Sequence, residues 1–314
     1  MGRGQTITII ANPISGGGAA YRKAQVLSAR LTKLGMPCRV LTTGRTFHGR
    51  ELARESAGES SVVVAVGGDG TVNEVVEGLA GTETPLVVLP TGTANVLAHE
   101  LRITRHVGSA LKAIVRGRHR HMDLGHVIDP QDDPNRRNWF ACMASCGFDA
   151  AVARSMHLQR TGSINYGHYV PVTVKAFCDY TYPSLSVKLD GCWWPREVRH
   201  VVICNTRSYG GPFRIATKAH CDDGLFDVVL LEHGGPVWML AYMAAMVVRA
   251  QFVLPGVKMV RARGVRVESR GPAMYQLDGD FVGYTPFEVE MEAGALPVLT
   301  ARRREDDERK SVQD

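Results

Sequence analysis

The residues with the clearest chemistry form a glycine-rich loop, Gly67-Gly68-Asp69-Gly70. The loop follows an apolar run, Val62–Val66, typical of a strand buried on both faces, and a helix is expected from about Thr71 to Ala80. Glycines let a backbone approach a ligand closely, and a helix N-terminus offers free N–H groups and a positive dipole. This construction favours a phosphate site over an ordinary turn that needs glycine. Asp69 would repel phosphates unless a cation lay between them, which suggests Mg²⁺.

Two further loops follow neighbouring strand-like runs. Asn12-Pro13-Ile14-Ser15-Gly16-Gly17-Gly18 comes after Thr6–Ile10, and Pro90-Thr91-Gly92-Thr93-Ala94-Asn95 comes after Leu86–Leu89. Either loop alone is best explained as a plain turn. Open α/β sheets bind ligands at the carboxyl ends of their strands, so three such loops together indicate a nucleotide site. The spacing matches neither the P-loop nor the dinucleotide fingerprint.

The elements that position these loops alternate between strand and helix. Apolar positions at steps of three and four predict a helix from Tyr21 to Leu34, and Cys38–Thr42 and Arg50–Glu55 continue the alternation as strand and helix. This order predicts an α/β nucleotide-binding domain with a parallel sheet and helices on both faces, over residues 1–130.

The second half of the chain has a different pattern. Short strand-like segments separated by Gly, Pro and Asp, of which Trp139–Cys146 is the first, predict a β-rich, sandwich-like domain over residues 131–301. Two helices are expected within it, at Tyr166–Asp179 and Pro236–Arg249. The charged tail, 302–314, could pack back on the first domain.

Composition narrows the class of protein. The chain has 314 residues, of which 45% are apolar and 22% charged, as in a soluble globular protein of two domains. The net charge of +6 is compatible with any anionic partner, but nothing in the pattern of basic and aromatic residues suggests nucleic acid. Seven cysteines without a CxxC pair argue against disulfides and zinc.

The longest apolar run, Pro236–Val248, is shorter than the roughly 20 residues that cross a bilayer. A buried helix and the wall of an acyl-chain cleft are equally good interpretations of this run.

Together the motifs resemble a known family. Asn12-Pro-x-Ser-Gly, Gly67-Gly-Asp-Gly-Thr-x-Asn and Pro90-Thr-Gly-Thr-Ala-Asn, in this order, are similar to the diacylglycerol kinase catalytic family, which includes soluble bacterial lipid kinases and the sphingosine and ceramide kinases. Asp222–Asp227 and Leu277-Asp278-Gly279-Asp280 extend the resemblance over residues 6 to about 300. It implies an ATP- and Mg²⁺-dependent lipid kinase with an NAD-kinase-like nucleotide domain and a β-rich lipid domain.

The resemblance also implies roles for single residues. Asp280 would be the general base, and Asp69 and Asp123 would belong to the network that holds catalytic Mg²⁺. A second, structural Mg²⁺ would be held by the Asp223 side chain and the backbone carbonyls of His220 and Leu225. The expected ATP contacts are Asn12, Pro13, Ser15, Gly16, Thr43, Gly67, Gly68, Asp69, Gly70, Thr71, Val72, Asn73 and Thr93.

Two positions depart from the family pattern. Val96 stands where many members have an acid, which weakens the expected Mg²⁺ network. The expected base is Asp280 where the family has Glu, and a misplacement of about 1 Å can lower a rate about 100-fold.

We therefore expect a cytoplasmic lipid kinase that associates peripherally with the membrane, with a homodimer possible. The substrate could be diacylglycerol, ceramide, a sphingoid base or a phosphatidyl polyol. Two alternatives remain open: a kinase of a soluble small molecule such as NAD, and a catalytically weak sensor of nucleotide or lipid.

Overall fold

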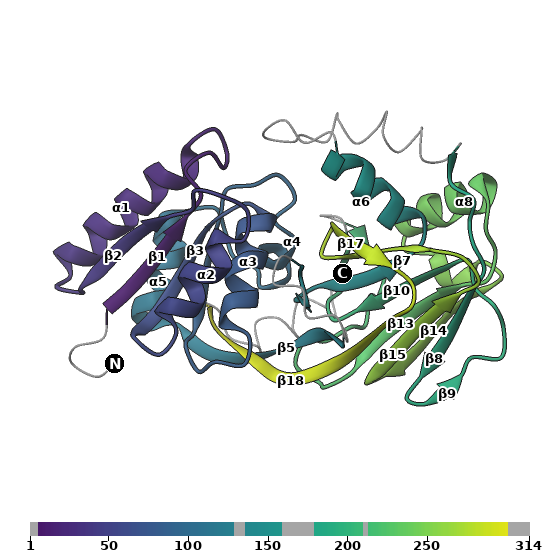
Figure 1. Ribbon diagram of the computed structural model, residues 1–314. Coiled ribbons are helices and arrows are strands. Elements are labelled where there is room, and N and C mark those ends of the chain that lie inside the picture. Colours follow the sequence, from purple (N-terminus) through teal and green to yellow (C-terminus); the bar gives the residue numbers. More distant parts are fainter. Residues whose placement is uncertain (1–5, 129–135, 159–178, 210–212, 301–314) are drawn as a thin grey trace. The chain divides into compact units, whose positions relative to one another are not determined.

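The computed structural model describes residues 6–128, 136–158, 179–209 and 213–300 (Figure 1). The chain forms two compact units. The first contains the residues up to Met122 together with those from Gly294, and the second is Asp123–Ala293. Three features of the sequence lie outside the described residues. They are the tail 302–314, Cys178, and the helix expected at Tyr166–Asp179 except for its last residue.

The first unit is a parallel α/β sheet. Its strands run in the order β2-β1-β3-β4-β18, and each neighbouring pair is parallel. The expected parallel sheet is therefore confirmed. The elements are β1 Thr6–Ala11, α1 Ala19–Lys33, β2 Cys38–Thr42, α2 His48–Ser56, β3 Ser60–Gly67, α3 Asp69–Leu79, β4 Leu86–Pro90, α4 Val96–Glu100, α5 Val107–Arg116 and the last part of β18 Phe287–Thr300.

Helices cover this sheet because alternate strand residues point to opposite sides. Ile9 and Val64 face α1 and α5, where Leu27 and Leu31 are fully buried. Helices α2 and α3 pack on each other; α2 also packs on β1 and β3, and α3 on β3 and β4. Each buried Leu contributes about 1.5–3 kcal/mol to folding, so the sequence pattern of α1 fixes it against the sheet.

The second unit is built from antiparallel strands. Six of them form a sheet in the order β14-β13-β10-β7-β16-β17, and β18, β15, β8 and β9 form a second run. The elements are β5 Arg118–Ile128, β6 Trp139–Phe140, β7 Met143–Cys146, α6 Phe148–Leu158, β8 Leu185–Leu189, β9 Cys192–Trp193, β10 His200–Cys204, β11 Ser208–Tyr209, β12 Phe213–Arg214, β13 Phe226–Leu231, α8 Pro236–Val247, the 3-10 turn η1 Gln251–Val253, β14 Val257–Ala262, β15 Gly264–Ser269, β16 Met274–Leu277 and β17 Asp280–Tyr284.

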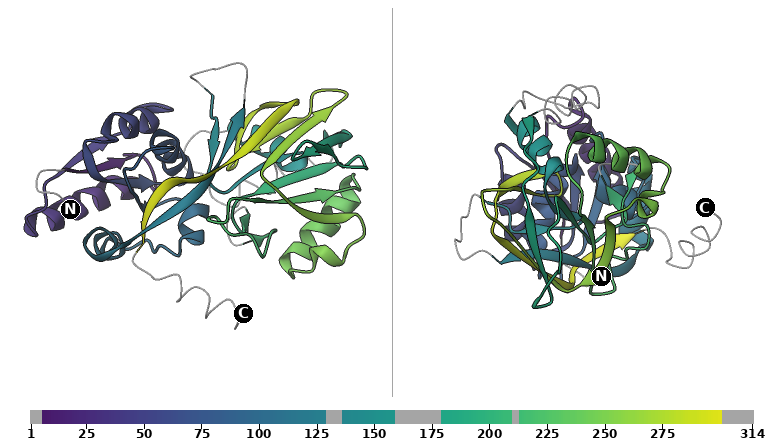
Figure 2. Two further views of the ribbon diagram at one scale, coloured as in Figure 1. Left: turned by 90° about the horizontal axis from the view of Figure 1, so that it is seen from below. Right: turned by 90° about the vertical axis from the view of Figure 1, so that its right-hand side faces the viewer.

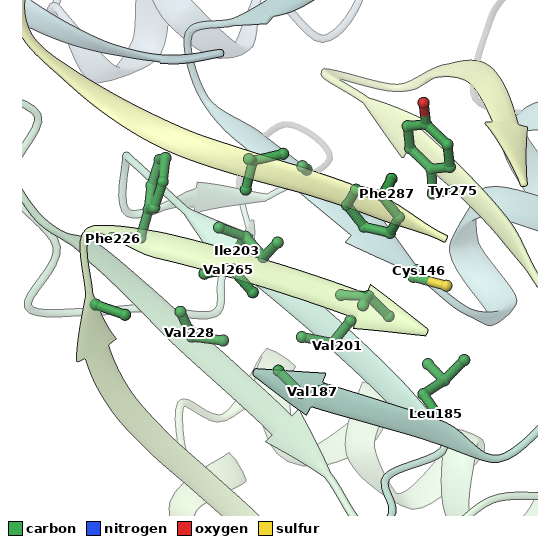
Figure 3. Packing of buried hydrophobic residues seen from close by; sticks show 14 of the residues in the cluster. Cys146, Leu185, Val187, Val201, Ile203, Phe226, Val228, Val265, Tyr275 and Phe287 are labelled. Carbon is green, nitrogen blue, oxygen red and sulfur yellow. The ribbon is translucent and has the colours of Figure 1, made fainter. Parts of the chain in front are cut away.

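The core of the second unit lies between these two runs of strands. In Figure 3, Val201 and Val228 come from the six-stranded sheet, and Val187 and Val265 come from the other run. This arrangement is the expected β-sandwich. Strand β18, yellow in Figures 1 and 2, contributes Phe287 to this core and pairs Val298 with Leu86 in the first unit.

Helix α8 differs from the buried helix that its composition allowed. Met239 and Tyr242 are its buried residues, whereas Val237 and Leu240 are exposed. No helix in the described part of the chain has the length and apolar character needed to cross a membrane. The six cysteines within the described ranges form no disulfide, as expected.

Candidate active site

Three loops meet at the carboxyl edge of the parallel sheet. Hydrogen bonds tie them together: Thr91 N donates to Gly67 O at 2.8 Å, and the hydroxyls of Ser15 and Thr91 are 3.0 Å apart. Asn12 N donates to Val66 O at 3.2 Å. The structure thus brings together the three glycine loops that the sequence singled out.

The loops approach so closely that glycine is required at their contacts. A Cβ on Gly92 would lie 2.7 Å from Gly68 Cα, which is closer than real Cβ contacts allow. Gly16 has φ +58, and a Cβ there would lie 2.8 Å from the carbonyl oxygen of Thr91. Side chains at these positions would separate the loops and fill the space beside the exposed backbone.

Asp69 lies at the start of α3 and binds the third loop. Its Oδ2 accepts a hydrogen bond from Asn95 N at 2.8 Å, and its Oδ1 accepts one from Val96 N at 2.6 Å. A cation is therefore not the sole explanation for an acid at this position. A carboxylate oxygen can accept a hydrogen bond and bind a cation at the same time, so an acid at this position fits Mg²⁺.

The side chains of the helix residues assigned to ATP are less accessible. Thr71, Val72 and Asn73 are all buried in α3. Backbone groups at Gly68, Asp69 and Gly70 are the better candidates for contact with phosphate, as is usual at a helix N-terminus.

Two more of the expected ATP residues lie in loops held by charged side chains. Thr43 is mostly buried, and its loop leads into α2. Glu74 of α3 accepts hydrogen bonds from Phe47 N and Gly49 N, at the start of α2, at 2.9 Å each. Thr93 is exposed, and its carbonyl accepts from Arg105 Nη2 at 3.1 Å.

Two basic side chains at this edge of the sheet were not identified from the sequence motifs. Arg105 binds the carbonyls of Gly92 and Thr93, and Lys23 Nζ from α1 donates to the Arg105 carbonyl at 2.8 Å. Burial, and then the charge of Arg105, lower the pKa of Lys23. Neither residue belongs to a glycine motif, so composition alone could not have found them.

The second unit holds the Asp-Gly motif in a tight hairpin. Leu277 pairs with Asp280, and the two residues between them have positive φ, 49° at Asp278 and 88° at Gly279. Asp-Gly is favoured in such two-residue turns. The motif is therefore a hairpin turn, and the turn gives its two acids different surroundings.

Asp278 is a buried anchor. Its oxygens accept hydrogen bonds from the backbone N–H groups of Ala141, Cys142 and Met143 at 2.8–2.9 Å. Burial raises the pKa of the Asp278 carboxyl, and Arg137 and the three N–H groups oppose this. Asp278 thus connects the hairpin to β7.

Asp280 is the more accessible acid, with 32% of its side chain exposed. The guanidinium of Arg137, which sequence motifs did not single out, donates from Nη1 to Asp280 Oδ2 at 2.9 Å. Arg137 is itself buried and also donates to the carbonyls of Leu277 and Trp139. Arg137 therefore fixes Asp280 through one carboxylate oxygen, Oδ2.

Asp123, the remaining acid of the expected catalytic network, is buried in the second unit. Its Oδ2 accepts from Gly224 N at 2.7 Å, and its backbone N donates to Cys221 O at 2.7 Å. The structure thus joins Asp123 to the segment that carries the expected structural metal site.

That second metal site does not fit its residues as they stand. Asp223 Oδ2 is paired with the Arg261 guanidinium, and Asp223 Oδ1 accepts from Leu225 N at 3.2 Å. The exposed His220 ring lies 3.3 Å from Arg207 Nη2. The Arg261 guanidinium at the Asp223 carboxylate disfavours a divalent cation there, so a structural Mg²⁺ at His220, Asp223 and Leu225 stays a prediction. Among the described residues, no group of three or more His, Cys, Asp or Glu side chains could hold a metal.

Comparison with known proteins supports one family. The diacylglycerol kinase catalytic domain model matches residues 6–127, and the YegS C-terminal NAD kinase beta sandwich-like domain model matches residues 142–300. A protein of Mycobacterium tuberculosis named diacylglycerol kinase is 32% identical over 301 residues, which cover 94% of this chain and 95% of that protein. The chain belongs to this family of lipid kinases.

A second relative, a Bacillus subtilis protein named diacylglycerol kinase, is 26% identical over 287 residues, covering 89% of this chain and 91% of that protein. A diacylglycerol kinase structure from Bacillus anthracis has a TM-score of 0.66 at 17% identity, covering 94% and 96% of the two chains. Yeast NADH kinase has a TM-score of 0.50 at 11% identity, covering 99% and 86%. These two structures confirm the NAD-kinase-like fold.

Proposed function

We propose that this lipid kinase transfers the γ-phosphate of ATP, with Mg²⁺, to a hydroxyl of a diacylglycerol-like membrane lipid. The observation that carries the proposal is the set of three glycine loops tied together at one sheet edge, through Thr91–Gly67 and Asp69–Val96. Phosphoryl transfer depends mostly on positioning and charge stabilisation. Backbone N–H groups fixed along the edge of the sheet can position a triphosphate and stabilise its negative charge.

In this proposal the phosphate chain lies along Gly16, Gly68 and Gly92, where no side chain blocks the backbone. Asp69 holds the cation with its carboxylate, which Asn95 N and Val96 N orient. When bound, Mg²⁺ neutralises the phosphate charge. Arg105 and Lys23 keep the third loop against α1, so the loop does not have to be ordered when ATP binds.

Asp280 is the proposed general base. Arg137 holds Oδ2, which leaves Oδ1 to accept the proton of the lipid hydroxyl. The hydroxyl oxygen then attacks the γ-phosphorus, the bond from that phosphorus to the β–γ bridging oxygen breaks, and ADP leaves. The proton on Asp280 returns to solvent before the next turnover.

The substrate is tested by measuring ADP release with mixed vesicles that contain diacylglycerol, ceramide, sphingosine or a phosphatidyl polyol, and with NAD in their absence. We expect turnover with diacylglycerol in vesicles and none with NAD. Turnover with NAD alone would overturn the lipid substrate, and ATP binding without turnover on any acceptor would favour a sensor.

We further propose that the kinase works peripherally at the cytoplasmic face of a membrane, since ATP is its phosphate donor and its acceptor resides in the bilayer. Fractionation of cells that produce the chain tests this location. A homodimer is a separate proposal, which sedimentation equilibrium of the purified chain tests.

A further inference from the structure

Helix α8 is apolar on both of its faces. On one face Met239 and Tyr242 are buried, and Trp238 and Met246 pack beside them against the cluster that contains Val229 of β13. Val229 alternates with Val228, which belongs to the core in Figure 3, so α8 covers the other face of the six-stranded sheet. One apolar face is enough to hold a surface helix, and the opposite face ordinarily carries polar side chains.

The opposite face of α8 carries large apolar side chains instead. Val237 is 81% exposed, Leu240 63% and Val247 64%. Their spacing of three and seven residues places them on one stripe of the helix. Val248, immediately after α8, and Val253, in η1, are 71% and 85% exposed. An exposed apolar surface of this size marks a site of interaction with a membrane or a protein.

The charges near this surface favour a membrane over a protein as its partner. No Asp or Glu occurs between Glu232 and Glu268. The cation Arg249, which directly follows α8, is exposed. Apolar side chains beside a cation, in a stretch of sequence without acids, complement an anionic bilayer, in which acyl chains lie below negative headgroups.

We propose that this surface, the α8 face, docks on a bilayer that contains anionic phospholipid. The α8 face comprises Val237, Leu240, Val247, Val248, Phe252 and Val253. Helix α8, about 18 Å long, lies in the membrane interface with Val237, Leu240 and Val247 inserted, and Arg249 contacts headgroup phosphates. The proposal rests on the proposed function in one respect, because a lipid substrate explains why the enzyme needs a bilayer contact.

The test is co-sedimentation of the full chain with phosphatidylcholine vesicles, with and without phosphatidylglycerol. The variant Leu240→Asp/Val247→Asp removes two inserted side chains. The matched control Val26→Asp/Leu34→Asp changes two exposed apolar residues of the α1 region, which are 44% and 56% exposed. We expect the α8 variant to lose about tenfold or more in vesicle partition, since burial of a single Leu or Val suffices for that, and the control to bind as the wild type does.

A second variant, Arg249→Ser, should weaken the preference for phosphatidylglycerol and keep the weaker binding to pure phosphatidylcholine. Unchanged partition of Leu240→Asp/Val247→Asp would overturn the proposal. Sedimentation equilibrium tests whether the α8 face instead binds a second copy of the chain. If Leu240→Asp/Val247→Asp abolishes self-association without changing vesicle binding, the α8 face is an interface between copies, and membrane docking is wrong.

The enzyme assay separates this inference from the proposed function. Turnover on a short-chain diacylglycerol, below its micellar concentration, should be the same in the wild type and in Leu240→Asp/Val247→Asp, because α8 lies outside the proposed catalytic residues. If no lipid is turned over by either protein but the variant still loses vesicle binding, the docking surface stands and the proposed substrate falls.

Discussion

Arg137 donates from Nη1 to Oδ2 of Asp280 at 2.9 Å, and it does so from a buried position. The same guanidinium lies 3.9 Å from Asp278, so one cation faces both acids of the Asp-Gly-Asp hairpin. Burial of a guanidinium is costly unless carboxylates and carbonyls satisfy it. Arg137 is therefore a fixed support for the hairpin, and Asp280 is the acid that keeps an accessible oxygen.

The first prediction compares the two acids. Asp280→Asn should lower kcat by about 10²–10⁴-fold, the usual contribution of a general base, with little change in apparent ATP affinity. Asp278→Asn should instead lower the melting temperature, because an amide group would replace an oxygen that accepts a buried backbone N–H. Steady-state kinetics and thermal melts of both variants make the comparison.

Asp280→Glu is the graded control and should retain partial activity, since it restores the family's residue in a hairpin shaped for a shorter one. A folded Asp280→Asn enzyme with most of its kcat, alongside a folded Asp278→Asn enzyme without it, would assign the base to Asp278 instead.

Sequence periodicity was enough to predict β1 to β4 and α1 to α3 of the first unit, because β1, β3 and β4 are buried along almost their whole length. The run Val62–Val66, predicted as a strand buried on both faces, lies inside β3. Helices α4 and α5 and the pairing of β18 with β4 were not predicted. The short strands of the second unit carried a weaker signal: Trp139–Cys146, expected as one strand, is divided into β6 and β7. Helix α6, Phe148–Leu158, was not predicted at all, and its stripe of apolar residues is weak.

The candidate site was predictable where backbone geometry demands particular residues and not where side chains reach across the fold. Glycine at 68 and 92 is dictated by a close approach, so the motif is visible in the sequence. Arg137 and Asp280 are 143 positions apart, and no local pattern reports a pair at that separation.

The second prediction concerns the contact between two glycine loops. Gly92→Ala should weaken ATP binding by about tenfold or more, because its Cβ would lie 2.7 Å from Gly68 Cα and push the loops apart. Overpacking of this kind typically costs about 1–3 kcal/mol. Calorimetric titration with ATP measures the affinity.

Gly108→Ala is its matched control, since a Cβ at Gly108 in α5 would meet nothing within 4 Å. Equal ATP affinity in Gly92→Ala and Gly108→Ala would show that the loops do not need this approach to bind nucleotide.

The third prediction concerns Asp69. Asp69→Asn should abolish kinase activity for two reasons: it removes the charge proposed to bind Mg²⁺, and it sets an amide N–H against Asn95 N or Val96 N. Loss of one such helix-start contact costs about 0.5–2 kcal/mol, so the protein should stay folded. Activity and circular dichroism are measured across a Mg²⁺ titration, and near-normal turnover at saturating Mg²⁺ would contradict a role in cation binding.

The last prediction concerns the second metal site, where Arg261 competes with a cation for Asp223. Arg261 Nε also lies 4.0 Å from Asp227 Oδ1; burial raises the pKa of Asp227, and Arg261 opposes this. Without nucleotide, the wild-type melting temperature should therefore be insensitive to Mg²⁺. Arg261→Ala should be less stable and should regain stability with Mg²⁺, because two carboxylates are then left without their cation.

The pH dependence gives an independent check of the same pair. A native pKa for Asp227 above its ordinary value of 3.8 means that the native state binds the proton more readily, so stability falls as pH rises between the two values. That fall should be larger in Arg261→Ala, since burial and the charge of Asp223 then raise the pKa of Asp227 without Arg261 to oppose them. Thermal melts between acidic and neutral pH measure it. If Mg²⁺ instead stabilises the wild type, and Asp223→Ala removes that effect, then Arg261 gives way to a bound metal and the site is the one that the family resemblance implies.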